Sequence, residues 1–573
     1  MMIQSREVTR RDLRASRRPR SPRTRLIAAA AVAAAAFAAG IVVGSGAGQG
    51  PEQRVAARFT AAWERGEWAR MWALSGGPHR PRDVAAFATR YRSAAETATA
   101  ARVRFGRPER PHDGVVAVPA VVETRLWGTL RATLRLPMRG TGDHTRVAWR
   151  RELVFPGLRR GERLRRQTTM PDRAELRFRD NTPMTRFPQL AASIAGALGP
   201  IPAERAGRLR ALGVPDDVQV GISGLQRAFD ERLIGRPGGL LFAGHRVLAQ
   251  AVSRAARPLR TTISPGVQRA AIDALAGRLG GAIALRPATG EILGAAGVAW
   301  SALQPPGSTF KIVTLAGVLE AGLASPSTPF PVQTETTLSG VRLENANGEA
   351  CGGTLAQAFA ESCNSVFAPL GARLGAGRLV AVARRFGFGE PPGLAGAATS
   401  TLPAPEQIGD DLAVGSSAIG QGRVEATALQ MALVAATIAR AGRRPRPTLV
   451  LGERRPAARA VSSRVARVVA RLMRGVVRHG TGTAAALPNV PVAGKTGTAE
   501  LKSTVQSAEE QGAEQDAPRQ EDASDTDAWF AAFAPARRDR PARVAVAVLL
   551  VQAGAGGDTA APAARGVLEA GLR

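Results

Sequence analysis

The chain has 573 residues, enough for about three or four domains of ordinary size. Hydrophobic residues make up 45% of it and charged residues 22%, which excludes a wholly disordered protein, and two cysteines with five histidines exclude the zinc-finger, iron–sulfur and disulfide-rich classes. The net charge is +32, but the arginines are spread along the whole chain, so we expect an anionic membrane or cell-wall surface as a partner and no nucleic acid. We also expect no cofactor and no metal.

Residues 1–25 form a basic tail, with nine arginines against Glu7 and Asp12. The next stretch, Leu26–Val43, is uncharged, apolar and 18 residues long, which is just enough to span a bilayer. Because arginines mark the cytoplasmic side, we predict a cytoplasmic tail at 1–25, a single transmembrane anchor at 26–44 in the plasma membrane and an extracytoplasmic remainder. A cleaved signal peptide is the alternative, and it exports the same residues.

A small N-terminal α+β domain is predicted over residues 52–155. Apolar residues at helical spacing predict helices over 52–74 and 83–98. Valine-rich and alternating segments then predict strands over 115–122, 124–136 and 146–155. Helices followed by a run of strands are typical of an α+β fold.

Residues 156–265 are rich in Arg, Gly and Pro, and their helical patches are short, as at 222–234. We interpret this region as a connection between two domains. Regular helix and strand patterns become recognisable after this region, and we predict a C-terminal domain over 266–573. Its first element is a predicted helix at 268–279. Segments 282–285 and 291–294 then flank a turn and predict a β-hairpin.

The remainder of the C-terminal domain contains one segment of low complexity. Residues 501–526 are acidic and polar with almost no apolar anchor, so we predict a solvated, disordered loop. The elements expected around it are a helix at 312–319 after Pro305-Pro306-Gly307, strands at 528–534 and 542–551, and a final helix at 560–572.

Ser308 and Lys311 form the first candidate catalytic pair. Of the 78 lysines and arginines only three are lysines. We therefore interpret each lysine as standing at a position whose function an arginine cannot perform. Residues three apart share one face of a helix, so the Ser308 hydroxyl and the Lys311 amine can meet. A hydroxyl needs a base to become a nucleophile, and a buried neutral lysine can be that base whereas arginine stays charged. At a helix N-terminus, backbone N–H groups also suit a developing oxyanion.

Ser362 and Asn364 follow 54 and 56 residues after Ser308, in the sequence Ser-Cys-Asn. They interrupt a helical stretch that begins with the capping-box pair Thr354 and Gln357. A second hydroxyl near the base can relay protons, and the Asn364 amide can hold a peptide group through its donor and its acceptor. A simple polar break between two helices is the alternative.

Lys495, Thr496, Gly497 and Thr498 follow a predicted strand at 490–494. The glycine lets a ligand backbone approach closely, and the two hydroxyls with the lysine charge can bind a carboxylate. An ordinary surface turn is the alternative for this motif taken alone.

Together the motifs stand in the order S-x-x-K, S-x-N and K-T-G, the serine-acylating set of penicillin-binding proteins and class A β-lactamases. From about Leu259 to its end the chain resembles a class B penicillin-binding protein, a bacterial peptidoglycan transpeptidase. The segments that extend the resemblance are Thr289–Leu293, Pro306–Lys311, Ala418–Gly422, Gly494–Glu500 and Ala528–Phe530.

This resemblance implies an α+β multidomain protein whose transpeptidase domain is an antiparallel sheet flanked by helices. The N-terminal part resembles the small domain of methicillin-resistance-type members, and 156–265 resembles their pedestal or dimerisation-like region. Two features depart from the family pattern: Pro171–Ala174 ends in alanine where the family has glycine, and the segment between Gly294 and Gln304 is short.

The resemblance also implies a role for each motif residue. Ser308 is the acylated nucleophile and Lys311 its base, while Ser362 relays protons. The other roles are these: Asn364 holds the substrate amide, Lys495 completes the electrostatic centre, Thr496 and Thr498 bind the terminal carboxylate beside Gly497, and the backbone N–H groups of Ser308 and Thr498 form the oxyanion hole.

The implied reaction attacks the D-Ala–D-Ala bond of a peptidoglycan stem peptide, releases D-Ala and passes the acyl group to an amine on a neighbouring strand. β-Lactams inhibit such an enzyme, and a glycosyltransferase of the cell-wall machinery is an expected partner. One rival is a D,D-carboxypeptidase or β-lactamase, which uses water as the acceptor. The other is a non-catalytic protein: a β-lactam sensor would need a signalling output, which the short arginine-rich tail does not offer, and the three intact motifs speak against a pure cell-division scaffold.

Cys351 and Cys363 are the only cysteines and stand 12 residues apart. An oxidising compartment permits a bond between them, and that bond would hold the segment that carries Ser362 and Asn364. The alternative is a small buried apolar Cys363 and an unrelated loop thiol at Cys351.

Overall fold

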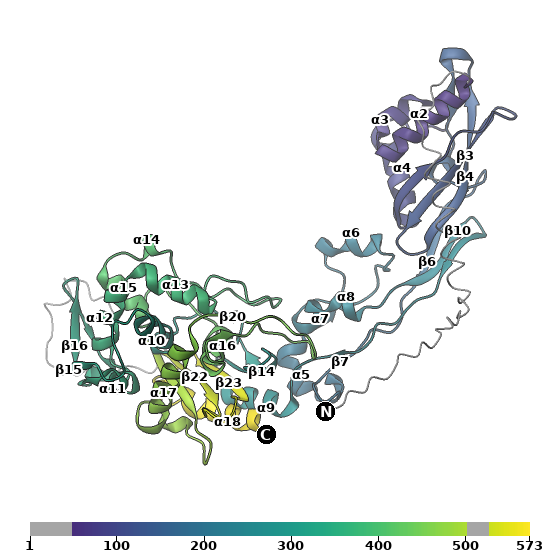
Figure 1. Ribbon diagram of the computed structural model, residues 1–573. Helices are drawn as coiled ribbons and strands as arrows, with labels where there is room; N and C mark the ends of the chain where they lie inside the picture. Colours follow the sequence, from purple (N-terminus) through teal and green to yellow (C-terminus); the bar gives the residue numbers. More distant parts are fainter. Residues whose placement is uncertain (1–48, 501–525) are drawn as a thin grey trace, which may run out of the picture. The chain divides into compact units, whose positions relative to one another are not determined.

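The computed structural model describes residues 49–500 and 526–573, which form two compact units (Figure 1). Among the described residues, the first unit contains 49–169, 207–215 and 237–252. The second contains 170–206, 216–236, 253–500 and 526–573. The connecting region predicted at 156–265 is therefore divided between the two units. The predicted tail and anchor at 1–44 lie outside the described residues, and so does nearly all of the acidic segment predicted to be disordered.

In the first unit, helices pack on a five-stranded sheet of order β1-β5-β4-β3-β2. The single helix predicted over 52–74 is wrong, because Gly66, with a φ of 68°, ends α2 and a second helix follows. In the core, the Trp149 indole donates a hydrogen bond to the Tyr91 hydroxyl over 3.1 Å. The elements are α2 (Pro51–Arg65), α3 (Trp68–Ala73), β1 (Ser75–Gly76), α4 (Val84–Thr97), β2 (Ala100–Phe105), β3 (Val115–Thr124), β4 (Gly128–Arg139) and β5 (Arg146–Ala148).

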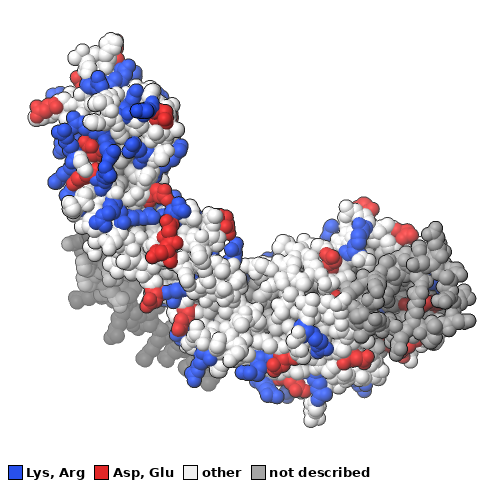
Figure 2. Space-filling view, turned by 180° about the vertical axis from the view of Figure 1, so that it is seen from behind, with Lys and Arg blue, Asp and Glu red and all other residues white. Residues whose placement is uncertain are grey.

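The strand predicted over 146–155 begins where expected but is too long, since β5 ends at Ala148 and the 3₁₀ turn η2 (Arg151–Val154) follows. A separate three-stranded sheet of order β11-β10-β6 completes the first unit. Its strands are β6 (Leu164–Thr169), β10 (Gly238–Ala243) and β11 (Arg246–Ala251). On the face drawn in Figure 2, basic side chains crowd the surface of this unit.

The part of the second unit before Leu259 consists of short elements. The helix predicted at 222–234 is two helices, α7 (Gly224–Ala228) and α8 (Asp230–Leu233). Asp230 is buried, and Arg173 and Arg205 both bind its carboxylate. Arg173 belongs to the segment Pro171–Ala174, which departs from the family pattern. The ion pairs with Asp230 therefore fix the position of this segment. The other elements are β7 (Leu176–Arg177), α5 (Pro188–Ala195), β8 (Leu198–Gly199), α6 (Ala203–Ala211), which crosses the boundary of the two units, β9 (Val220–Gly221) and β12 (Leu259–Arg260).

The centre of the second unit is a fully antiparallel five-stranded sheet of order β14-β13-β23-β22-β21. The predicted hairpin is confirmed, because β13 pairs with β14. Helix α9 ends at Leu275, four residues earlier than predicted, since Ala276 has a φ of 47°. The strands are β13 (Gly280–Leu285), β14 (Ile292–Gly297), β21 (Ala493–Glu500), β22 (Thr526–Ala534) and β23 (Val544–Leu550).

Helices cover both faces of this sheet, as the resemblance implied. Alternate residues of β22 point to opposite faces, so Phe530 joins a core with α9 and α18, and Trp529 joins a larger core with α10 and α16. The helices are α9 (Pro265–Leu275), α10 (Lys311–Glu320), α11 (Leu355–Ala360), α12 (Asn364–Leu374), α13 (Ala376–Phe386), α14 (Pro405–Ile408), α15 (Asp411–Ala418), α16 (Ala428–Ala439), α17 (Ser463–His479) and α18 (Ala560–Leu572). Three short strand pairs lie outside the main sheet. They are β15 (Pro329–Gln333) with β18 (Cys351–Thr354), β16 (Glu335–Leu338) with β17 (Val341–Glu344), and β19 (Arg443–Arg444) with β20 (Ala458–Arg459).

Within residues 49–500 and 526–573, no single helix is both long and apolar enough to cross a bilayer. Helices α12 and α13 meet that condition only as a pair, and a bend of 101° separates them.

Candidate active site

Ser308 lies in a tight turn that leads into a buried helix. The turn η4 (Gly307–Phe310) is a 3₁₀ helix, and α10 begins directly after it at Lys311. Gly307 has a φ of 50°, and a Cβ placed on it would lie 2.5 Å from the Thr498 carbonyl oxygen. Only glycine therefore fits, and the turn is held against the strand that carries the third motif.

Lys311 is fully buried at the start of α10. Its amine donates hydrogen bonds to the Ser362 carbonyl over 2.6 Å and to Asn364 Oδ1 over 2.7 Å, and it lies 3.4 Å from the Ser362 hydroxyl. We expected the Ser308 hydroxyl as its partner, yet in the described chain the amine is bonded to the second motif instead. Burial, and then the nearby charge of Lys495, hold the pKa of Lys311 well below its usual range. A neutral amine is what a general base at this position requires.

Ser362 occupies the break between α11 and α12 with a φ of 69°, a left-handed conformation that few residues other than glycine adopt. The predicted capping box is confirmed at the start of α11, where the Thr354 hydroxyl accepts a hydrogen bond from the Gln357 N–H and Gln357 Oε1 accepts one from the Thr354 N–H. Strained backbone of this kind collects at functional sites, where the surrounding structure holds it in place.

Cys351 and Cys363 form a disulfide, with their Cα atoms 5.8 Å apart. The predicted bridge is thus present, and it joins the first residue of β18 to the residue between Ser362 and Asn364. The Asn364 side chain is fixed a second time, since its Nδ2 donates to the Glu344 carbonyl over 3.0 Å. The loop that carries the second motif is therefore held both at Cys363 and at Asn364.

Lys495 lies within β21 and is fully buried. The expectation that the K-T-G motif follows a strand is wrong, because the strand begins at Ala493 and the motif is part of it. The Lys495 amine donates to the Ser362 hydroxyl over 2.7 Å and to the Thr496 carbonyl over 3.2 Å. Burial lowers its pKa to about 7. Two amines from different elements thus converge on one hydroxyl.

Gly497 faces the Ser308 turn across a very short gap. A Cβ at this position would lie 2.8 Å from the Pro306 carbonyl oxygen and 3.1 Å from the Thr309 nitrogen. We expected this glycine to admit a ligand backbone. The structure gives it a further function, because its missing side chain lets β21 pack directly against η4.

Thr481 is a site residue that the sequence analysis missed. Its hydroxyl lies 2.5 Å from the Thr496 hydroxyl, and its N–H donates to the Ala360 carbonyl over 3.1 Å. It therefore links the K-T-G strand to the last residue of α11, two positions before Ser362. Thr498 is held in a similar way, since its hydroxyl accepts a hydrogen bond from the Gly556 N–H over 3.4 Å. The only signal in the sequence was a threonine between two glycines after a long amphipathic helix.

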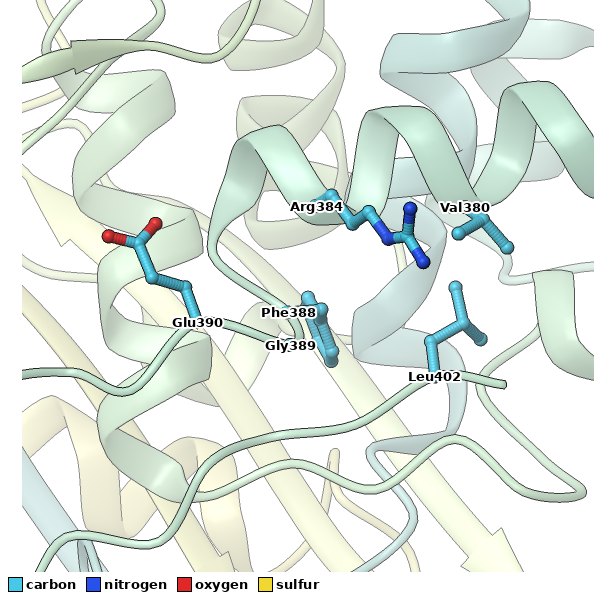
Figure 3. A pocket seen from close by; sticks show the side chains of 6 residues that line it. All are labelled: Val380, Arg384, Phe388, Gly389, Glu390 and Leu402. Atoms are coloured by element: carbon cyan, nitrogen blue, oxygen red, sulfur yellow. The ribbon is translucent and has the colours of Figure 1, made fainter. Parts of the chain in front are cut away.

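A cavity of about 400 Å³ opens elsewhere in the same unit, between α13 and the segments that follow it. Figure 3 shows the Arg384 side chain extending along it toward Val380 and Leu402, with Glu390 at the opposite end. None of the eight predicted site residues lines it. Its link to the site is Phe388, whose ring packs edge-on against Phe310 in η4, with ring centroids 5.2 Å apart.

The fold and the site together define a class: a serine acyltransferase whose nucleophile turn and K-T-G strand lie side by side on an antiparallel sheet. Residues 280–569 match the family model described as "Penicillin binding protein transpeptidase domain". This match covers half of the chain, and the chain belongs to that family.

Three known proteins illustrate the similarity. The peptidoglycan D,D-transpeptidase PbpA of Mycolicibacterium smegmatis is 35% identical over 428 residues, which cover 61% of this chain and 80% of that protein. PbpA of Mycobacterium tuberculosis is 34% identical over 415 residues, covering 60% and 77%. The crystal structure of the D,D-transpeptidase domain of a peptidoglycan glycosyltransferase from Eggerthella lenta has a TM-score of 0.55 and 28% identity, covering 70% of this chain and 99% of that one.

Proposed function

We propose that this chain is a peptidoglycan D,D-transpeptidase that works through an acyl-enzyme on Ser308. The observation that carries the proposal is the convergence of two buried lysines, Lys311 and Lys495, on the Ser362 hydroxyl. Burial lowers the pKa of both amines, that of Lys495 to about 7, so each amine loses its proton more readily than an ordinary lysine and can pass it on through the shared hydroxyl. A serine nucleophile at Ser308 needs a neighbouring base that can take its proton, and these amines can supply it.

In the proposed first step, the Ser308 hydroxyl oxygen attacks the carbonyl carbon of the D-Ala–D-Ala peptide bond, and the Ser308 proton passes to the neutral Lys311 amine. The backbone N–H groups of Ser308 and Thr498 stabilise the negative charge on the carbonyl oxygen. The C–N bond then breaks, the departing D-Ala amine receives a proton by way of Ser362, and an ester remains on Ser308.

In the second step, an amine of a neighbouring stem peptide attacks this ester. A new amide forms, the Ser308–acyl bond breaks, and the proton lost by the amine returns to Ser308 through Lys311. A β-lactam takes the place of the donor peptide in the first step, and its opened ring stays bound as the ester.

Substrate binding is assigned to the edge strand β21 and to Asn364. The Thr496 and Thr498 hydroxyls bind the terminal carboxylate, and the charged form of Lys495 attracts it. The Asn364 amide has one N–H on the Glu344 carbonyl, which leaves its second N–H for the substrate peptide. The chemistry needs no cofactor, since every proton and electron pair comes from the protein or the substrate.

We extend the proposal to the location of the enzyme. The basic residues 1–25 and the apolar stretch at 26–44 support a single-pass protein of the plasma membrane with its catalytic unit outside. The helices and sheet at 52–155 support a small N-terminal domain of the methicillin-resistance type. A strand polymer is the substrate, so a glycosyltransferase that makes such strands is the expected partner.

The test of the acyl-enzyme is intact mass spectrometry of the full-length protein in detergent after penicillin treatment. We expect one penicillin adduct on the wild type and on Ser301→Ala, and none on Ser308→Ala. An adduct that persists on Ser308→Ala would overturn the assignment of the nucleophile.

The test of the acceptor uses stem pentapeptide strands with and without an added amine. We expect a cross-linked dimer as the main product, with D-Ala released in equal amount. Release of D-Ala without a dimer would identify a D,D-carboxypeptidase, and rapid loss of the penicillin adduct to water would identify a β-lactamase.

A further inference from the structure

Helix α17 carries five arginines on one face, and we call this set the arginine ridge. At 3.6 residues per turn their positions fall within an arc of about 80° around the helix axis. Four of the side chains are exposed and that of Arg474 is half-buried. The members of the arginine ridge are Arg464, Arg467, Arg471, Arg474 and Arg478.

The opposite face of α17 is fully committed to the protein core. Its buried residues are Val465, Ala466, Val469, Leu472, Met473, Val476 and Val477. The arginine ridge therefore points directly away from the core, and the helix has no freedom to rotate its charges toward another part of the unit. The ridge from Arg464 to Arg478 covers 14 residue steps, or about 21 Å at 1.5 Å per residue.

The arginine ridge has no acidic counterpart in the described part of the chain. Helix α17 contains no Asp or Glu, and none of the five arginines takes part in an ion pair with residues 49–500 or 526–573. Arginines elsewhere do find carboxylates, as Arg173 and Arg205 do on Asp230 and Arg444 does on Glu390.

This arrangement opposes the stability of the helix. Successive members of the arginine ridge stand three or four residues apart, the spacing at which like charges on a helix repel. A repulsive row that nothing in the described chain neutralises is what a surface for an anionic partner requires. Guanidinium groups bind both carboxylates and phosphates in a two-pronged geometry, and the polymer of the proposed reaction carries carboxylates.

The ridge helix runs into the candidate active site. It ends at His479, and two residues later the Thr481 hydroxyl contacts Thr496. A Cβ on Gly480 would lie 2.2 Å from the Ala360 carbonyl oxygen, so the end of α17 is fixed against α11. The C-terminal end of the arginine ridge is therefore its end nearer to the K-T-G strand.

We propose that the arginine ridge is an exosite for the peptidoglycan strand, which it binds through the free carboxylates of stem peptides beside the one that reacts. This inference rests on the proposed function, because it assigns the polymer of the same reaction. Each ion pair between an exposed arginine and a carboxylate contributes little affinity. Several pairs along one strand contribute more together, because the first pair raises the effective concentration of the remaining carboxylates at the ridge. The ridge then favours polymer over isolated peptide without touching the reacting atoms.

The test measures binding of soluble, uncrosslinked peptidoglycan strands to full-length protein in detergent, at low and at moderate salt. The ridge variant is Arg467→Gln/Arg471→Gln/Arg474→Gln. The control variant, Arg373→Gln/Arg378→Gln/Arg538→Gln, removes the same charge from exposed arginines elsewhere in the second unit. Strands whose free carboxylates have been amidated serve as the control ligand. Melting temperature and penicillin acylation check that each variant is folded.

We expect the ridge variant to lose strand affinity by about tenfold at low salt, a loss of the size that three exposed ion pairs give. The control variant keeps its affinity, and amidated strands bind all three proteins equally weakly. Equal affinity of ridge and control variants for native strands would overturn the proposal. So would a ridge variant that binds strands normally but loses binding to vesicles of anionic phospholipid, because the ridge would then be a membrane surface. A wild type that binds strands through the ridge but is not acylated by penicillin would instead refute the proposed function.

Discussion

The Lys495 amine donates a hydrogen bond to the Ser362 hydroxyl over 2.7 Å, although 133 residues separate the two in the chain. On its other side, the Ser362 hydroxyl lies 3.4 Å from the Lys311 amine. These contacts join three motifs that come from α10, from the break before α12 and from β21. The site is therefore a product of tertiary packing, and each of its members can be tested separately.

Replacing Lys311 by arginine keeps a positive charge but removes the ability to accept a proton near neutral pH. We expect Lys311→Arg to lose penicillin acylation, measured as the second-order rate constant with a fluorescent penicillin. A rate above about a hundredth of the wild-type value, the low end of general-base contributions, would show that Lys311 acts mainly through its charge.

The lowered pKa of Lys495 makes the stability of the protein depend on pH. Between about 7 in the folded state and 10.5 for an ordinary lysine, the unfolded chain holds the proton more strongly than the folded chain. The free energy of unfolding therefore rises with pH across this window. Lys495→Met removes that rise, so its melting temperature relative to the wild type should fall steadily from pH 7 to pH 10.

The matched control is Arg378→Met, which removes an exposed cation from the same unit. Its melting temperature relative to the wild type should stay constant over this range. A constant difference for Lys495→Met as well would mean that Lys495 keeps an ordinary pKa in the folded protein.

Thr481 is expected to act as a positioning residue for Thr496. The isosteric variant Thr481→Val loses the 2.5 Å contact between the two hydroxyls, and we expect acylation to slow by about three- to tenfold, the value of one hydrogen bond. Thr481→Ser keeps a hydroxyl and should restore most of the rate. The loss should appear with substrates that carry a terminal carboxylate and vanish with amide-capped analogues; an equal loss with both would indicate a purely structural function.

The bridge between Cys351 and Cys363 should be detectable in protein purified from the cell envelope. We expect no thiol alkylation until a reductant is added, followed by two labels per chain. Closing a loop over a separation of 12 residues is worth about 3 kcal/mol in the chain-entropy model, so reduction should lower the free energy of unfolding by a similar amount. Two reactive thiols in unreduced protein would contradict the bridge.

Much of the second unit could be predicted because its signals are local. The hairpin of β13 and β14, the capping box at Thr354 and the helix at 560–572 each follow from a few adjacent residues. Helix α9 ends four residues earlier than predicted for a reason that the pattern does not show, because Ala276 adopts a left-handed φ of 47° although it is an alanine.

The chemistry of the site was predictable from motif spacing, but its contacts were not. The Ser308 and Lys311 side chains looked like natural partners because they are three residues apart, yet the Lys311 amine is bonded to residues more than 50 positions away. Thr481 escaped notice for the same reason, since its value comes from Thr496 and Ala360 across the fold. Sequence separation hides contacts that only packing creates.

The left-handed backbone at Ser362 sets chemistry and stability against each other. A glycine would adopt the same φ of 69° without steric cost, so the backbone at this position favours the one residue that has no hydroxyl to offer. The disulfide at Cys363 and the hydrogen bonds of Asn364 hold the serine in place on its C-terminal side. Selection for stability alone would drift toward glycine here. A homologue with glycine at this position should therefore have a higher free energy of unfolding. It should still bind the substrate but lack the hydroxyl that relays protons.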